Sequence, residues 1–419
     1  MASRPRLDGI PMEIMENIVT LLAFSDICSL RLTGCKVSAK SSGGFFKSHF
    51  RNKTITMSSS EQLHEAVSMT QRQGFGCLLE NLTLVGLSKS CNPKDAAVLL
   101  GQAMKNLRLG LAGGCLPSLS LVIEDGVEYD GKSLAKDSNS WKSVWETAGE
   151  CFEATMQALS ASELPVESLD VFSGVTCCSL SLDRLVTIQE LNLSASLQRL
   201  KRLSMSLSHH MVCKLGYRSE ESEEMQALTS GERYTMAICK FLQNCSPVLE
   251  NLSLHWYKLR TINLSNAISE EVNFFDRVAQ WCQFPLLKRC TLKGIVTSEA
   301  SLLSFLRQMQ LNSIEMEEIH LHSGNFLLVF HYLVNHMEKL EHVHLSDLWE
   351  NHELIYFDAP GEPHFPGTEP QIGPNTLIRA GDDSHMPIEY EYKRGFPVHT
   401  PRYNIWARKR GVQYGPPPS

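Results

Sequence analysis

The chain has 419 residues, of which 43% are hydrophobic and 20% are charged, and these values are ordinary for a globular protein. The formal net charge of −7 gives no reason to expect nucleic acid or an anionic membrane as a partner. No stretch reaches the ~18 apolar residues of a membrane-spanning helix, and the N-terminus lacks the apolar core of a secretory signal. The 13 cysteines include no Cys-x-x-Cys pair. We therefore expect a cytoplasmic or nuclear protein.

The segment from Leu7 to Phe50 carries the signals of three short helices. Pro11 suits the start of the first helix, and apolar residues follow it at spacings of three and four. A second helix starts near Ser25 and Asp26, and a third contains Phe45. Three helices of this length bury little core by themselves, so the segment should dock onto a partner.

An ordered set of residues in this segment follows a known pattern. It comprises Ile10-Pro11-Met12-Glu13-Ile14, then Ile18 and Leu21, then Asp26-Ile27, Leu30-Arg31 and Cys35-Lys36. This set resembles the F-box motif in its fungal form. F-box domains bind the Skp adaptor of SCF-type cullin ubiquitin ligases, so the resemblance implies the Skp adaptor and the cullin scaffold as partners. Carried over by position, the adaptor-binding residues are Ile10, Pro11, Ile14, Ile18, Leu21, Leu22, Ile27 and Leu30.

From Ser58 onward, short apolar strands alternate with helices. One strand signature has apolar residues at its first, fourth and sixth positions and occurs eight times. The copies start at Leu79, Leu116, Val166, Leu200, Leu249, Leu287, Met316 and Leu340. The alternation predicts an α/β fold whose main part is an irregular leucine-rich-repeat-like solenoid with parallel strands. A doubly wound α/β domain is the structural alternative, because most repeats exceed the usual 20–29 residues.

Three regions follow from these patterns. We expect a three-helix F-box-like module at residues 1–57, the repeat domain at residues 58–350 and a proline-rich C-terminal tail at residues 351–419. The tail keeps many aromatic residues, so it should pack partly against the repeat, with short strands near Ile388 to Tyr392. Two polar inserts, Asp125 to Ser140 and the acidic Ser219 to Glu224, are interpreted as solvated loops.

Side chains alternate along a strand, so every second residue of each repeat strand should face away from the core. In a solenoid these residues form one wall, which is the usual place for partner recognition. The candidate substrate-facing residues are Asp170, Phe172, Ser204, Ser253, His255, Thr291, Lys293, His320, His322 and His344. The same register places Glu318 and His342 outward. Four histidines on two strands also raise a zinc hypothesis, although exposed polar residues at alternate positions need no ligand.

The chain carries no local motif of a serine hydrolase, a zinc protease or a phosphate-binding loop. We therefore expect no catalytic residue, no metal and no cofactor. The sequence predicts a substrate-recognition subunit of an SCF-type cullin ubiquitin ligase, whose F-box docks the Skp adaptor and whose repeat binds an unknown protein target. The alternatives are a protein-interaction scaffold without a role in ubiquitination and an enzyme on an α/β fold.

Overall fold

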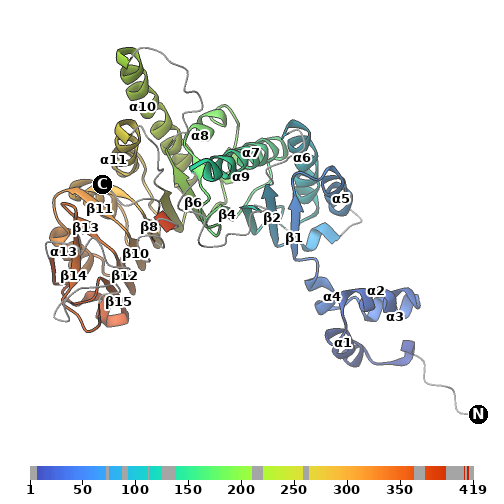
Figure 1. The fold of residues 1–419 in the computed structure, drawn as a ribbon. Coiled ribbons are helices and arrows are strands. Elements are labelled where there is room, and N and C mark those ends of the chain that lie inside the picture. Colours follow the sequence, from blue (N-terminus) through green and yellow to red (C-terminus); the bar gives the residue numbers. More distant parts are fainter. Residues whose placement is uncertain are drawn as a thin grey trace, which may run out of the picture.

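The computed structural model describes residues 7–71, 75–86, 93–111, 113–124, 138–209, 220–257, 264–362, 373–392, 410, 413 and 414. The chain is an α/β protein in which helices alternate with the strands of a large, mostly parallel sheet. A small group of helices precedes the sheet and lies beyond its first strand (Figure 1). In the described part of the chain, no helix is both long and apolar enough to cross a membrane.

Residues 7–50 form a group of short helices that we call the helical module. Its elements are η1 (Leu7–Gly9), α1 (Met12–Thr20), α2 (Phe24–Leu32), α3 (Cys35–Lys40) and α4 (Gly44–Ser48). The prediction of three helices was therefore wrong, because the chain leaves the helical conformation at Gly34 and starts again at Cys35. The module has a core of its own, which consists of Met15, Val19, Ile27, Val37 and Phe46.

Eleven strands of the described residues form the main sheet. Its order is β1-β2-β3-β4-β6-β7-β8-β10-β12-β15, and β5 pairs with β6 beside this path. The strands are β1 (Asn52–Thr56), β2 (Asn81–Gly86), β3 (Ser118–Ile123), β4 (Ser168–Val171), β5 (Leu180–Ser181), β6 (Arg202–Ser208), β7 (Asn251–Tyr257), β8 (Arg289–Lys293), β10 (Ser313–Glu317), β12 (His342–Ser346) and β15 (Thr376–Ala380). Neighbouring strands run parallel, except that β15 is antiparallel to β12. Strand β1 thus belongs to the sheet, although the sequence places it in the first predicted region.

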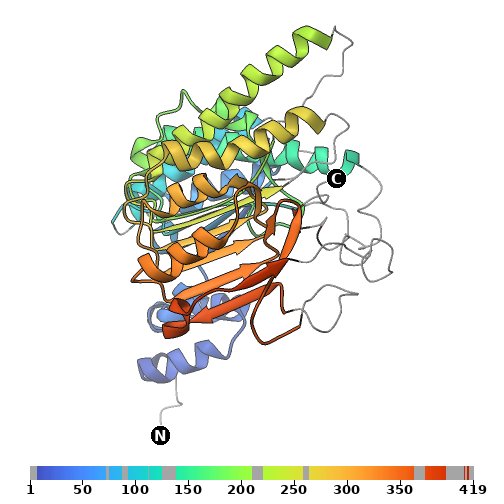
Figure 2. The ribbon, with the colours of Figure 1, turned by 90° about the vertical axis from the view of Figure 1, so that its left-hand side faces the viewer.

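The long helices form a layer on one side of the main sheet (Figure 2). The helices that follow the module are α5 (Ser60–Thr70), η2 (Phe75–Leu78), α6 (Pro93–Gly110), α7 (Ser138–Ser162), α8 (Asp183–Thr187), α9 (Ser194–Leu197), α10 (Glu220–Cys245), α11 (Leu264–Trp281), α12 (Glu299–Leu306), α13 (Leu327–His336) and η3 (Gly381–His385). Within this layer, helices pack against their neighbours in chain order, as α5 does on α6 and α11 on α12. A doubly wound sheet instead has helices on both faces and a reversal of strand order, so that alternative does not describe this chain.

The two polar inserts have different outcomes. The acidic residues 220–224 lie at the start of α10, so their interpretation as a loop was wrong. Of the insert Asp125 to Ser140, residues 125–137 lie outside the described residues, and the last three belong to α7.

The leucine signature marks the strands of the main sheet. For seven of the eight copies, the fourth and sixth positions are buried strand residues in matching register, as in Leu203, Leu252 and Cys290. The copy assigned to Met316–Leu321 was misplaced, because the strand that continues this ladder has Ile314 and Met316 at those positions. The parallel strands therefore contribute one apolar row after another to a single core.

A second sheet of five strands continues beyond the ends of β8, β10 and β12. Its order is β16-β14-β13-β11-β9, with β9 (Val296–Ser298), β11 (His320–Ser323), β13 (Trp349–Glu350), β14 (Glu353–Phe357) and β16 (Tyr390–Tyr392). Strands β9, β11 and β13 each follow a strand of the main sheet after two residues, the first of which forms a corner. These corner residues, Gly294, Glu318 and Asp347, have φ angles of 70°, 55° and 52°, in the left-handed region. The repeated corner redirects the chain at the same point of three successive units.

Candidate functional site

The face of the main sheet away from the helix layer carries polar side chains in register, and we call it the open face. One row crosses the sheet through paired positions, namely Ser120, Asp170, Ser204, Ser253, Thr291, Glu315 and His344. A second row runs beside it through His255, Lys293, Glu317 and Ser346. Small hydroxyl groups occupy the middle of the sheet, and charged groups gather on β8, β10 and β12.

Seven of the ten predicted substrate-facing residues lie on the open face. They are Asp170, Ser204, Ser253, His255, Thr291, Lys293 and His344, and all are half-buried. The other three lie elsewhere. Phe172 is fully buried. It follows the last residue of β4 and its own φ of 62° lies in the left-handed region, so the alternation of the strand does not extend to it. His320 and His322 belong to β11 of the second sheet, and His320 is buried.

Glu318 was also expected to face outward, but its side chain is fully buried. The reason is the corner at this residue, which breaks the strand alternation on which the expectation depended. The outward residues of β10 are instead Glu315 and Glu317. Neither carboxylate is among the predicted site residues, because the misplaced signature copy assigned the wrong strand.

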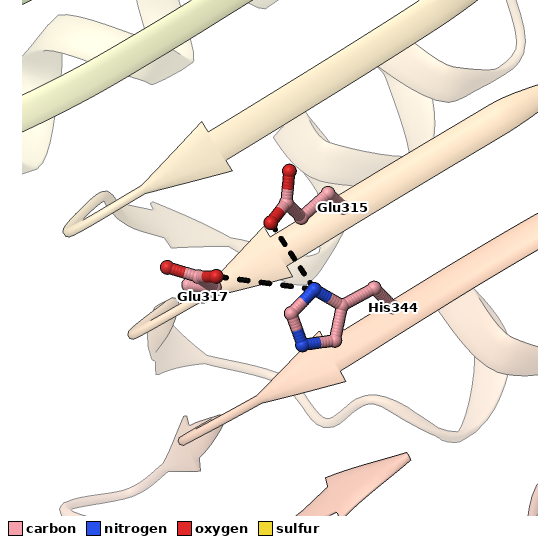
Figure 3. A group of neighbouring side chains, drawn as sticks. All are labelled: Glu315, Glu317 and His344. Carbon is pink, nitrogen blue, oxygen red and sulfur yellow. Dashed lines mark hydrogen bonds and ion pairs between the residues drawn. The ribbon is translucent and has the colours of Figure 1, made fainter. Parts of the chain in front are cut away.

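Four charged residues form a compact group on the open face (Figure 3 shows three of them). Lys293 Nζ lies 3.4 Å from Glu315 Oε1 and 3.0 Å from Glu317 Oε2. His344 Nδ1 lies 3.1 Å from Glu315 Oε1 and 3.8 Å from Glu317 Oε1. The Thr291 hydroxyl donates a hydrogen bond to Glu315 Oε2 at 3.0 Å. The two carboxylates thus lie between the Lys293 ammonium and the His344 imidazole.

The pKa values agree with an ion-pair network. The hydrogen bond with Glu315 raises the pKa of His344, and the two nearby carboxylates act in the same direction. The pKa of Glu315 is lowered, first by its hydrogen bond with His344 and further by the charge of Lys293. Both shifts favour the charged forms, so the network holds best where the imidazole is protonated and the carboxylates are ionised.

The zinc hypothesis joined four histidines, and the structure separates three of them. His320 lies beside Glu318, His322 Nε2 is 3.7 Å from Asp276, and His344 pairs with Glu315. A different set, Glu315, Glu317 and His344, has its ligand atoms within 4.8 Å of one another. Because Lys293 contacts both of these carboxylates, a cation there would have to replace an ammonium group. The group is therefore best described as an ion-pair network.

The predicted adaptor-binding residues differ in exposure. Pro11, Ile14 and Leu21 are exposed, whereas Ile10, Ile18, Leu22 and Leu30 are half-buried. Ile27 is fully buried in the core of the module and has no surface for a partner. The inward face of α1 is formed by Met15 and Val19, so Ile14 remains outside although it belongs to the apolar stripe of the sequence.

Three further residues near the open face were missed by sequence reasoning. The Tyr414 hydroxyl donates to Glu317 at 2.9 Å, Arg410 pairs with Glu318, and Trp349 Nε1 lies 3.4 Å from Glu318 Oε2. The aromatic content of the tail predicted that it packs on the repeat, but it gave no position. A contact across about a hundred residues leaves no local pattern in a single sequence.

Comparison with known proteins identifies no relative: no protein-family model and no curated protein matches this chain.

Proposed function

We propose that this chain is a substrate-recognition subunit of an SCF-type cullin ubiquitin ligase. In this proposal the helical module, as an F-box, docks the Skp adaptor, and the open face of a leucine-rich-repeat-like solenoid holds a protein target. The receptor performs no chemistry. It raises the effective concentration of the target near the enzyme that transfers ubiquitin.

The observation that carries the adaptor half of the proposal is the exposure of large apolar side chains on the module. Met12, Ile14, Leu21 and Leu32 are 49%, 51%, 86% and 88% exposed, although the module has a core of its own. Full burial of one such side chain contributes about 1.5–3 kcal/mol before the costs of association. Apolar side chains gathered on a small exposed unit are typical of a protein-interaction site.

The order of the strands supports the target-binding half. Successive strands of the main sheet are neighbours in space, and the helices between them stay on one side. Each unit thus adds one strand and one helix, as expected for a solenoid in which each repeat contacts its neighbours. Such an arrangement leaves the opposite face of the sheet for recognition, and that face carries the polar rows.

Co-precipitation with purified Skp adaptor tests the proposal. The Ile14→Asp variant places a charge on the exposed apolar surface of α1 and should reduce recovery of the adaptor at least about tenfold, as expected from a loss of ~1.5–3 kcal/mol. Val98→Asp is the matched control, because Val98 is an exposed apolar residue of α6, outside the module. It should behave as wild type. Equal recovery with wild type and Ile14→Asp would contradict the docking.

The same experiment separates the ligase from the scaffold. A ligase subunit should bring the cullin down together with the adaptor, whereas adaptor binding without cullin favours the scaffold. Accumulation of a target protein in cells that lack this chain provides the second criterion. A ligase subunit predicts such a target, and a scaffold predicts none.

A further inference from the structure

The C-terminal residues Arg410, Gln413 and Tyr414 lie against the charged end of the open face. Tyr414 donates to Glu317, and the Gln413 carbonyl oxygen lies 2.8 Å from His255 Nε2. Arg410 forms an ion pair with Glu318 at the next corner of the chain. These three residues thus contact β7, β10 and the corner that follows β10.

Arg410 occupies a pocket whose groups fit a guanidinium. The buried carboxylate of Glu318 contacts Arg410 and also lies 2.5 Å from His320 Nε2. The Trp349 ring stacks on the His320 ring with centroids 5.3 Å apart, and the guanidinium carbon lies 5.3 Å from the centroid of Trp349. A buried carboxylate beside a flat aromatic surface suits the planar guanidinium better than the compact ammonium of lysine.

Tyr414 occupies a neighbouring position that fits a phenol. Its ring meets the His255 ring with centroids 5.5 Å apart, and its hydroxyl reaches Glu317. Burial lowers the pKa of His255 to about 4, so the imidazole is neutral near pH 7. In the tautomer with a proton on Nε2, it donates a hydrogen bond to the Gln413 carbonyl. The site therefore contacts an arginine, a backbone carbonyl and a tyrosine of one segment.

These contacts determine which chemical groups bind at the site, and they add less to the stability of the fold. Burial lowers the pKa of Arg410 to about 10, which shows that removal of its charge from water opposes docking. The attraction between the partners of a buried ion pair is largely offset by this desolvation. A segment that offers the same groups in the same order can therefore take the place of the tail.

We propose that His255, Glu317, Glu318 and Trp349 form a binding site for a target segment that carries an arginine and, four residues later, a tyrosine. The chain's own tail fills this site in the absence of a target. The inference rests on the proposed target-binding role of the open face and names the chemistry that this face recognises. Because the tail is attached to the site, its effective concentration is on the order of millimolar, so a target must bind well to displace it.

A labelled peptide with the sequence of residues 405–417 tests this proposal by fluorescence anisotropy with the full chain. The double variant Arg410→Ala/Tyr414→Ala frees the site and should bind the peptide at least about tenfold more tightly than wild type, because the competing tail is lost. A control peptide with alanine at both positions should not bind. Addition of Glu318→Gln to the double variant should abolish binding of the original peptide.

The NMR titration of His255 reports whether the tail has left a folded site. Release should raise the pKa of His255 from about 4 toward its ordinary value of about 6.5. A double variant in which His255 titrates normally, but which binds the peptide no better than wild type, overturns the proposal.

The single variant Tyr414→Ala covers the case in which the double variant does not fold. It keeps the pair between Arg410 and Glu318, and it should give a smaller gain in affinity; an affinity equal to that of wild type overturns the proposal. The peptide assay contains neither adaptor nor cullin. Its failure is therefore distinct from a failure of the ligase function, which the co-precipitation measures.

Discussion

The helical module and the main sheet bury their apolar residues in different ways. In the sheet region, strands and helices contribute to one core that continues from Ile55 to Ile388. The module has a core of five residues, and six of the fourteen exposed large apolar side chains of the described residues belong to it. The sheet region thus completes its own core and presents polar groups, whereas the module keeps apolar groups outside. Relative to its length, the module therefore leaves more of its large apolar side chains exposed than the sheet region does.

The largest expected effect comes from the core of the sheet region. Phe305→Ala removes a fully buried ring that lies 5.0 Å from Phe275 and 5.8 Å from Phe284, measured between centroids. It should lower the free energy of unfolding by about 3–5 kcal/mol, since the lost contacts leave a cavity. Chemical denaturation followed by tryptophan fluorescence measures this, because residues 7–50 contain no tryptophan. Leu328→Ala, at an exposed position of α13, should change the midpoint little.

The matching substitution in the module is Met15→Ala, which empties part of a much smaller core. It should cost about 2–5 kcal/mol locally, enough to open the module while the sheet region remains folded. Hydrogen exchange should become faster in residues 7–50, and the tryptophan-monitored transition should stay in place. If that transition moves as far as it does in Phe305→Ala, the two cores unfold as one cooperative unit, and the module does not open independently of the sheet region.

The left-handed corner at Gly294 provides a test of the backbone in the sheet region. An alanine at Gly294 would place its Cβ 2.3 Å from the carbonyl oxygen of Trp256, at a φ of +70°. We expect a loss of about 1–3 kcal/mol, because the corner strain and the close contact add together. Gly110→Ala in α6 is the control, since no atom lies within 4 Å of its Cβ position, and it should be neutral or stabilising. Thermal unfolding of the two variants decides this.

The smallest effect concerns the charge balance on the open face. Glu315→Gln removes the main cause of the raised pKa of His344, so this pKa should fall toward about 6.5. A raised pKa in the folded state stabilises the fold below the unfolded value and loses this contribution as pH rises through the folded value. The variant should therefore lose stability mainly at acidic to neutral pH. NMR titration of His344 measures the shift; an unchanged pKa would show that another group holds the proton.

The sequence predicted the parts of the fold that follow from local periodicity. The spacing of Leu249, Leu252 and Leu254 identifies a strand and its buried side, because alternation and burial go together in a sheet. The strand prediction failed at Met316, because two overlapping six-residue stretches, starting at Leu311 and at Met316, both satisfy the strand signature. The frame that starts at Leu311 begins with leucine, as six of the other seven copies do, and this would have favoured the correct strand.

Other features depend on contacts that no local pattern records. The stripe of α1 did not reveal whether Ile14 or Met15 faces the core, because both are apolar and adjacent. The corner at Glu318 was hidden, since a glutamate in the left-handed region carries no glycine signal. The docking of Arg410 and Tyr414 brings together residues far apart in the sequence. The composition of the tail suggested that it packs on the rest of the chain, but no spacing of residues indicated where.

The connection between α4 and β1 has a mechanical consequence. Only His49, Phe50 and Arg51 separate the end of α4 from the strand, and the Arg51 carbonyl accepts hydrogen bonds from the amides of Glu80 and Asn81, each at 2.8 Å. The module therefore meets the sheet through a short, anchored joint, at the end of the molecule opposite β11 and β13 (Figure 1). Such a short connection restricts the movement of the module relative to the sheet. For two partners bound as proposed, the short connection would limit how far their separation can vary, and a flexible insertion at residue 50 would widen that range without altering either binding surface.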